Sequence, residues 1–371
     1  MPKPTRNCPG RRAAARVTRK PWAQRALGFS NVWPLTQGQG ITVAVVDSGV
    51  DYSRQLAGRV TAIDLTGTGL ADCVGHGTAV AAIIAASDIQ AEGTPFEGVA
   101  PDARILSVKV NSDETGSRRL LAEGIRDAAL LGAQVINVSI TSPNTPALQS
   151  AVAFALKKDV VIVACGGNDS AATGKGPFYP ASYPGVLSVG AVDSSGALAP
   201  FSDRKSRVAV TAPGVDVTSA FPGGYAQDDL IGTSYATPFV SGVVALVRSR
   251  YPGLSGPQVV ARIEATADGG TGQGTGGGLV NPVEAVTAIL GGGSASKPAP
   301  TATGPVSVSR KPPPDRTARA AFEVAGGSLG AAALVVLGAV VGRGGRRRRW
   351  RAGRMPESVS GGSVDGSWPW P

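Results

Sequence analysis

The sequence predicts an α/β fold in which a mostly parallel sheet is covered by helices on both faces. Short apolar runs typical of fully buried strands recur at 41–46, 105–110, 135–140, 160–164, 186–191 and 208–211. Stretches with helical spacing separate several of them, at 79–86, 117–132 and 146–157. Because strands that alternate with helices form parallel sheets, we expect the chemistry to lie at the carboxyl ends of the strands.

The charge of the chain is distributed unevenly along its 371 residues. The formal net charge is +10, but residues 1–27 alone carry eight Lys or Arg and no acid. Residues 343–354 carry seven Arg and no acid, whereas residues 28–290 hold 16 basic and 22 acidic side chains, a balance of −6. The basic residues are therefore concentrated at the ends, and nucleic acid is not an expected partner of the central domain.

Metal and cofactor sites are not predicted. The three cysteines, Cys8, Cys73 and Cys165, form no Cys-x-x-Cys pair and no cluster with histidine, so we do not expect a structural zinc site. No dense acidic loop indicates a calcium site. One disulfide with one buried thiol, or three free thiols, are both compatible with the sequence.

Composition divides the chain into five segments. They are a basic N-terminal extension at 1–27, a folded domain at 28–290, a Pro/Gly/Ser-rich linker at 291–320, a transmembrane helix at 321–342 and an Arg-rich tail at 343–371. The uncharged run at 324–342 has 19 residues, which as a helix spans roughly 28 Å, close to one bilayer core. A buried soluble helix is the alternative for this run.

The arginines after the predicted span set its orientation. Arginine beside a span usually stays cytoplasmic, which predicts a single-pass protein with an extracytoplasmic domain and a cytoplasmic tail. No signal-peptide core is present in residues 1–27, so we hypothesise that the written start lies downstream of the true one. A tail-anchored protein with a cytoplasmic domain is the rival arrangement.

One histidine, His76, is present in the whole chain. A lone histidine is usually a surface or satisfied core residue. Here it lies between Gly75 and Gly77 and before a run of small residues at 79–86. The glycines would let the backbone pass close to a substrate, and the helix would hold the imidazole rigidly. This context indicates a catalytic base.

An acid and a nucleophile accompany this histidine. Asp47 follows the first buried strand, although an aspartate there could simply open a turn, and Asp51 is a nearby competitor. Ser234 precedes the apolar helical run at 239–247, where a serine is often only a helix cap. The same position also offers backbone N–H groups and a helix dipole to a developing negative charge.

Three motifs together resemble the subtilase family of serine proteases. They are residues 43–49, 75–81 and 232–238, which contain Asp47, His76 and Ser234 in the subtilisin order. The resemblance implies a subtilisin-like fold and an endopeptidase that hydrolyses polypeptides through these three residues. Serine esterases of the α/β-hydrolase type have the nucleophilic serine before the histidine in the chain, within a Gly-x-Ser-x-Gly motif. Neither feature is present around Ser234.

Two further motifs between His76 and Ser234 support the resemblance. Residues 164–169 include Asn168, whose side chain would join the oxyanion hole. Residues 135–141 would bind the substrate backbone as an added strand and line the specificity pocket. The substrate-binding residues implied are Ser139, Ile140, Thr141 and Gly166. The family usually has glycine at the position of Thr141, which would narrow the pocket here.

A narrower resemblance is to the mycosins, the subtilases of type VII secretion systems. It rests on residues 21–24, 32–36 and 72–76, and on the linker, span and Arg-rich tail. It implies an N-terminal extension tied down by a disulfide, for which Cys8 and Cys73 are the candidates, and a secretion complex in the membrane as partner. The alternative function is that of a structural subunit in which proteolysis is dispensable.

Overall fold

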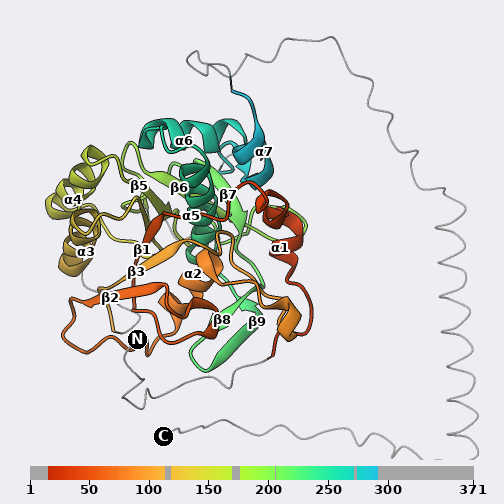
Figure 1. Cartoon of the computed structure of the whole chain (residues 1–371). Coiled ribbons are helices and arrows are strands. Elements are labelled where there is room, and N and C mark those ends of the chain that lie inside the picture. Colours follow the sequence, from red (N-terminus) through yellow and green to blue (C-terminus); the bar gives the residue numbers. More distant parts are fainter. Residues whose placement is uncertain (1–15, 113–117, 169–175, 205, 271–273, 291–371) are drawn as a thin grey trace, which may run out of the picture. The chain divides into compact units, whose positions relative to one another are not determined.

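A twisted, mostly parallel sheet lies at the centre of the computed structural model, which describes residues 16–290 except 113–117, 169–175, 205 and 271–273 (Figure 1). Within these residues the sheet has nine strands in the order β10-β11-β7-β6-β5-β4-β1-β3-β2. Neighbouring strands are parallel except for β10 and β11. The bounds are β1 Thr42–Asp47, β2 Val60–Asp64, β3 Arg104–Lys109, β4 Val135–Val138, β5 Val161–Cys165, β6 Leu187–Val192, β7 Val210–Pro213, β10 Asp268–Gly269 and β11 Gly278–Leu279.

Both faces of this sheet are buried. Val43 and Val45 of β1 belong to one apolar cluster, while Ala44 and Val46 belong to a second cluster on the other face. Successive side chains of a strand point to opposite faces, so a strand covered on both sides needs apolar residues throughout. This explains why the central strands appear in the sequence as continuous apolar runs, and it confirms the predicted fold class.

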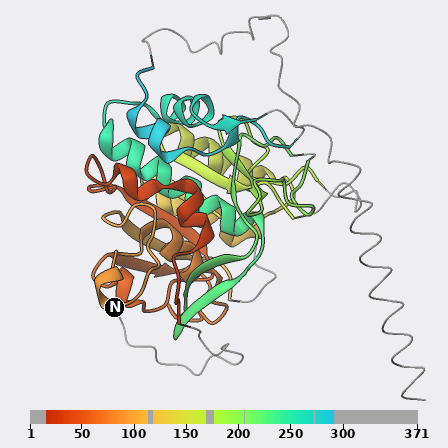
Figure 2. The same cartoon turned by 90° about the vertical axis from the view of Figure 1, so that its right-hand side faces the viewer.

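The helices divide between the two faces. The cluster with Val43 is completed by α2 and α5, together with residues of α1, α6 and α7, whereas α3 and α4 cover the other face (Figures 1 and 2). The bounds are α1 Trp22–Leu27, α2 His76–Ala85, α3 Arg118–Leu130, α4 Pro146–Lys157, α5 Thr233–Arg250, α6 Gly256–Ala265 and α7 Pro282–Thr287. Short 3-10 helices occur at η1 Phe29–Val32, η2 Arg54–Leu56 and η3 Gln90–Glu92.

Strand β4 ends earlier than the sequence predicted. The apolar run suggested a strand over 135–140, but β4 pairs with β5 only over 135–138. Ser139 follows the paired residues, and its hydroxyl donates to the carbonyl of Ser234 in α5. The residues that follow it are therefore outside the paired sheet.

A separate antiparallel hairpin, β8 Val217–Phe221 and β9 Gly224–Leu230, extends beside α2 (Figure 2). It leads directly into α5. No helix among the described residues has the length and apolar character needed to cross a membrane. The predicted linker, span and tail at 291–371 lie outside the described residues.

Candidate active site

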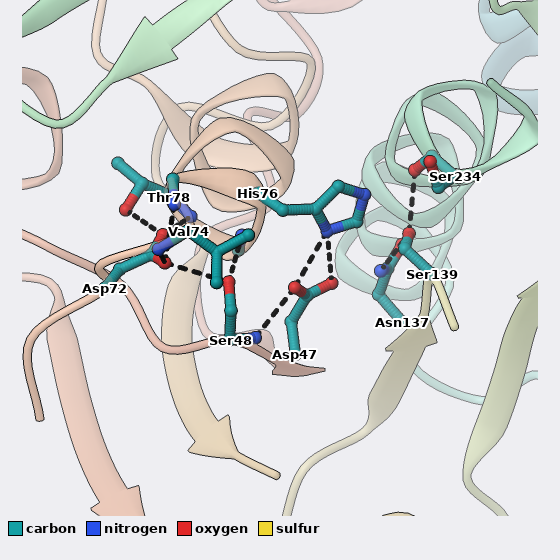
Figure 3. A network of polar contacts seen from close by, with 11 residues as sticks. Asp47, Ser48, Asp72, Val74, His76, Thr78, Asn137, Ser139 and Ser234 are labelled. Carbon is teal, nitrogen blue, oxygen red and sulfur yellow. Dashed lines mark hydrogen bonds and ion pairs between the residues drawn. The ribbon is translucent and has the colours of Figure 1, made fainter. Parts of the chain in front are cut away.

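The side chains of Asp47 and His76 meet at the carboxyl end of β1 (Figure 3). Asp47 is the last residue of β1, and His76 is the first residue of α2. His76 Nδ1 lies 2.8 Å from Asp47 Oδ1 and 3.0 Å from Oδ2, and the Ser48 amide donates to Oδ1 over 2.7 Å. A carboxylate only accepts, so Nδ1 carries the proton and Nε2 is left as the basic nitrogen.

The glycines beside His76 allow helix α2 to approach other parts of the protein. A Cβ on Gly75 would lie 2.2 Å from the ring of Phe221, and one on Gly77 would lie 2.1 Å from the carbonyl oxygen of Gly49. These close contacts are with the protein's own hairpin and the turn after β1. The sequence had suggested that the glycines make room for a substrate. In the structure the two glycines let α2 pack closely enough for the imidazole of His76 to contact Asp47.

The surroundings of the imidazole favour its protonated form. Burial by itself lowers the pKa of His76, but the charge and hydrogen bond of Asp47, and then the charge of Asp72, raise the pKa above its ordinary value of 6.5. The side chain is still 21% exposed, and the ring of Tyr235 packs against it with 5.0 Å between ring centroids. The imidazole is held on one side and open on another.

Ser234 lies in the first turn of α5, beside the side chain of Asn168. Asn168 Oδ1 accepts hydrogen bonds from the amide and the hydroxyl of Thr233, both of 2.8 Å. These bonds fix the orientation of the Asn168 amide group, so that Nδ2 points away from Thr233. A Cβ built on Gly232 would lie 3.2 Å from Asn168 Nδ2 and 3.0 Å from Ser234 Oγ. A hydroxyl and an amide donor thus border one small space, which a glycine leaves open.

The hydroxyl of Ser139 holds the backbone of Ser234. In a regular helix the Ser234 carbonyl would accept from the amide of residue 238, but Pro238 has no N–H. Ser139 Oγ donates to this carbonyl over 2.8 Å instead. Ser139 in turn accepts from Asn137 Nδ2 over 3.0 Å, and Ser241 donates to Asn137 Oδ1 over 2.8 Å. A buried polar network therefore links the end of β4 to α5 (Figure 3).

The other predicted substrate-binding residues lie around this network. Ile140 is half-buried and Thr141 is exposed, directly after Ser139. Gly166 is buried, and its amide donates to the carbonyl of Val189 in β6 over 2.9 Å, so this amide serves the protein's own backbone.

The cysteines differ in their surroundings. Cys73 is disulfide-bonded, whereas Cys165 at the end of β5 is a free, buried thiol. Burial, followed by the nearby charge of Asp47, raises the pKa of Cys165 to about 12, which makes the thiol unreactive at neutral pH. The predicted disulfide partner Cys8 lies outside the described residues. No group of three or more potential metal ligands occurs among the residues that the structure describes.

Two polar residues of the site were not singled out from the sequence. Thr233 orients Asn168 through two hydrogen bonds, and Asp72 is fully buried beside the start of α2. Both belong to the motifs around His76 and Ser234. Thr233 directly follows Gly232 and Asp72 lies three residues before Gly75, but this position near a glycine did not distinguish a structural anchor from a turn residue.

Comparison with known proteins identifies the family. The model of the subtilase family matches residues 38–281, which include Asp47, His76, Asn168 and Ser234. The chain belongs to the subtilase family. It is accordingly a subtilisin-type serine endopeptidase. The fold, the family and the enzyme class predicted from the sequence are thereby confirmed.

Within the family the chain is similar to mycosins. It is 35% identical to Mycosin-4 of Mycobacterium tuberculosis over 379 residues, which cover 88% of this chain and 81% of that protein. It is 33% identical to Mycosin-1 of Mycolicibacterium smegmatis, covering 89% of this chain and 86% of the relative. The crystal structure of MycP1 with its N-terminal propeptide removed matches with a TM-score of 0.66 and 33% identity, over 74% of this subtilase and 99% of MycP1.

Proposed function

We propose that this subtilase cleaves peptide bonds with Ser234 as nucleophile, His76 as general base and Asp47 as the group that orients His76. Ser234 Oγ bonds to the scissile carbonyl carbon as its proton passes to His76 Nε2. His76 then gives that proton to the leaving amine as the C–N bond breaks. A water molecule, deprotonated in the same way, releases the acyl group and restores Ser234.

The observation that carries this proposal is the fixed pair of Asp47 and His76 on one side and of Ser234 and Asn168 on the other. Asp47 sets the tautomer of His76, which leaves Nε2 able to take a proton. Asn168 Nδ2 and the backbone N–H groups at the start of α5 supply hydrogen bonds to the oxyanion. We further propose that the edge after β4, with Ile140 and Thr141, receives the substrate as an added strand.

Ser234→Ala tests the nucleophile. We expect it to abolish both peptide hydrolysis and labelling by a fluorophosphonate probe, since the attacking oxygen is gone. The control is Ser249→Ala on the same helix, which should leave labelling intact. Labelling that persists in Ser234→Ala would refute the assignment.

Asn168→Asp tests the oxyanion donor separately. Aspartate keeps an oxygen that can accept from Thr233 but has no N–H to donate. We expect kcat to fall about 100- to 1000-fold with KM little changed, the magnitude found for the corresponding donor in subtilisin. A loss confined to KM would assign Asn168 to substrate binding instead.

We also propose that the enzyme is anchored in a membrane by residues 321–342 and acts in a type VII secretion system, on the extracytoplasmic side. The similar proteins MycP1 and MycP3 come from the ESX-1 and ESX-3 type VII secretion systems. The uncharged run and the arginines after it support the anchor. The full-length chain should resist carbonate extraction from membranes, and a chain ending at residue 297 should not.

A scaffold role is the second candidate, favoured by the same similarity to secretion components. The two functions separate in a secretion assay. If proteolysis is required, a Ser234→Ala strain should fail to secrete, as a deletion strain does. Full secretion by the Ser234→Ala strain would show that the protein serves chiefly as a structural subunit. A disulfide between Cys8 and Cys73, which we propose ties the N-terminal extension to the site, can be checked by mass spectrometry of the non-reduced protein.

A further inference from the structure

Asp72 has a fully buried carboxylate at the start of α2, the helix that begins with His76. It precedes α2 in the chain and accepts five hydrogen bonds (Figure 3). The donors are the hydroxyl of Ser48 at 2.9 Å, the amides of Val74 at 3.2 Å, Gly75 at 2.7 Å and Thr78 at 2.8 Å, and the hydroxyl of Thr78 at 2.6 Å. Burying a carboxylate costs free energy unless hydrogen bonds compensate for the lost water, and here five donors supply that compensation.

The hydrogen bonds to Asp72 favour its ionised form. Three of the five are backbone N–H groups, which cannot accept. The hydroxyls of Ser48 and Thr78 donate to Asp72 and also accept, from the Gly77 amide over 3.0 Å and from the Asp51 amide over 2.9 Å respectively. Burial raises the pKa of Asp72, and the hydrogen bonds from Thr78, Gly75 and Ser48 oppose this rise without cancelling it.

Ser48 joins this carboxylate to the one that orients His76. Its amide donates to Asp47 Oδ1 over 2.7 Å, and its hydroxyl donates to Asp72 Oδ1 over 2.9 Å. The Gly75 amide donates to the same oxygen, Oδ1, and the Thr78 amide donates to Oδ2, so both oxygens of Asp72 are bound at the first turn of α2, whose first residue is His76. Asp72 therefore connects the turn after β1 to the start of the helix that carries the imidazole.

We propose that Asp72 is a positioning residue for His76: an ionised, buried carboxylate that fixes the imidazole through Ser48 and α2 and adds its charge to that of Asp47. The proposal rests on the assignment of His76 as the base. Two negative groups behind the ring favour the imidazolium that forms when the nucleophile gives up its proton. Asp72 thus lowers the cost of that step without touching the substrate.

Other charged groups around α2 do not replace this effect. The elements packed against α2 are α5, β8, β1, β3 and η2. Beside Asp47 and Asp72, the titratable or charged side chains of these elements are Arg54, Arg104, Lys109, Tyr235, Arg248 and Arg250, with Asp51 of the turn after β1 and Cys165 of β5 nearby. Lys109 Nζ is bound to the carbonyls of Gly69 and Ala71, and Arg54 pairs with Glu92. Burial raises the pKa of the Cys165 thiol to about 12, so this thiol is neutral near pH 7, and β8 contains no ionisable side chain.

The single histidine of the chain gives this proposal a direct test. Histidine labelled with ¹³C and ¹⁵N produces one imidazole signal set in the full-length chain, and the Ser234→Ala background prevents self-cleavage. We expect Asp72→Asn to lower the pKa of His76 by about half a unit or more, since a negative charge is lost. The control Thr78→Val keeps the charge and removes one donor, and it should leave the pKa of His76 within about 0.2 units.

An unchanged pKa in Asp72→Asn, or an equal fall in Thr78→Val, would overturn the electrostatic part. Ser48→Ala tests the positioning part even where Asp72→Asn does not fold, because both carboxylates remain. It should lower kcat roughly tenfold with KM little changed, as small misplacements of catalytic groups do. An unchanged kcat would overturn it. The titration is independent of activity, so a failure of the protease assignment would appear separately, as hydrolysis by Ser234→Ala.

Discussion

At the scale of single residues, the two ring nitrogens of His76 have different roles. Nδ1 donates to Asp47, which fixes the ring and its tautomer, and Nε2 is left to exchange a proton. The raised pKa means that the imidazolium is easier to form than in a free histidine. The same shift means that the basic form needed to start the reaction is present only above that raised pKa.

The pH dependence of the reaction follows from this shift. We expect kcat/KM to fall as the pH drops through the raised pKa of His76, with the acidic limb above the ordinary value of 6.5. Asp47→Asn should move that limb to lower pH, because the largest raising influence is lost, and reduce kcat by about 10⁴-fold. Initial rates on a peptide substrate across the pH range provide the measurement. An acidic limb that stays in place would contradict the role of Asp47.

The same titration affects stability with the opposite sign. A folded-state pKa above the unfolded value stabilises the protein fully below about 6.5, and this contribution is lost as the pH rises through the folded value. Activity and this part of the stability therefore change in opposite directions with pH. The enzyme works where the pairing of His76 with Asp47 contributes least to folding.

The sequence was informative about residues that react and less so about residues that support them. His76 was found because it is the only histidine and lies in a motif, and Asp47 and Ser234 because they end a strand and begin a helix. Asp72 could not be assigned a role, since an aspartate near glycine in a loop is equally typical of a turn. Its role depends on five donors from segments up to 24 residues apart, which no local pattern reveals.

At the scale of elements, the junction between β9 and α5 determines the shape of the site. Gly232 has a φ of 149° and lies where a side chain would meet both Ser234 Oγ and Asn168 Nδ2. A residue with a Cβ would be strained there and would fill the space next to the attacking oxygen. This glycine serves the reaction as well as the turn.

Alanine variants of two glycines can distinguish backbone strain from obstruction of the space beside Ser234 Oγ. Gly232→Ala should remove nearly all activity, since its Cβ would lie 3.0 Å from Ser234 Oγ. Gly223→Ala in the β8–β9 turn is the control, because Gly223 also has a positive φ, of 91°, but no atom lies within 4 Å of its Cβ position. Both should lower the melting temperature, and only the first should lower kcat. Comparable kcat values in the two variants would contradict the obstruction.

The proline in α5 leads to a second expectation about elements. Because Pro238 leaves the Ser234 carbonyl without its helical donor, Ser139→Ala should cost about 1 kcal/mol through a part-buried carbonyl without a hydrogen bond. Pro238→Ala restores an N–H at that place, so adding it to Ser139→Ala should recover part of the loss. Denaturant unfolding of the two single variants and the double variant gives the coupling. Strictly additive effects would show that the two groups do not share the carbonyl.

The strands that the sequence predicted are the ones buried on both faces. Strands β1, β3, β4, β5, β6 and β7 and helices α2, α3 and α4 were found to within a few residues. Strands β2 and β9 and helix α6 were not, because β2 and β9 are largely half-buried and mix polar with apolar residues. Short strands at the sheet edge depend on their neighbours, which a local pattern does not include.

At the scale of the whole molecule, residues 16–36, called here the N-terminal segment, contact distant parts of the domain. Trp22 Nε1 donates to the carbonyl of Val215 over 3.1 Å, and Arg19 forms an ion pair with Asp228 of the hairpin at 2.6 Å. Helix α1 packs against β8, and η1 packs against α7, the last described helix. The segment therefore connects the hairpin beside the site with the end of the domain.

Two leucines of this segment test whether it belongs to the core. Leu27 is 4% exposed and part of the cluster with Val43, whereas Leu35 is 47% exposed. Leu27→Ala should cost about 2–5 kcal/mol of unfolding free energy, since it removes buried apolar surface and leaves a cavity. Leu35→Ala should cost about 0.5 kcal/mol or less. The denaturant midpoints of the two variants provide the comparison. If they agree, the segment packs on the domain without stabilising it, and α1 could be removed without loss of the fold. A large difference means that the folded domain begins before residue 28 and that the N-terminal segment contributes to its stability.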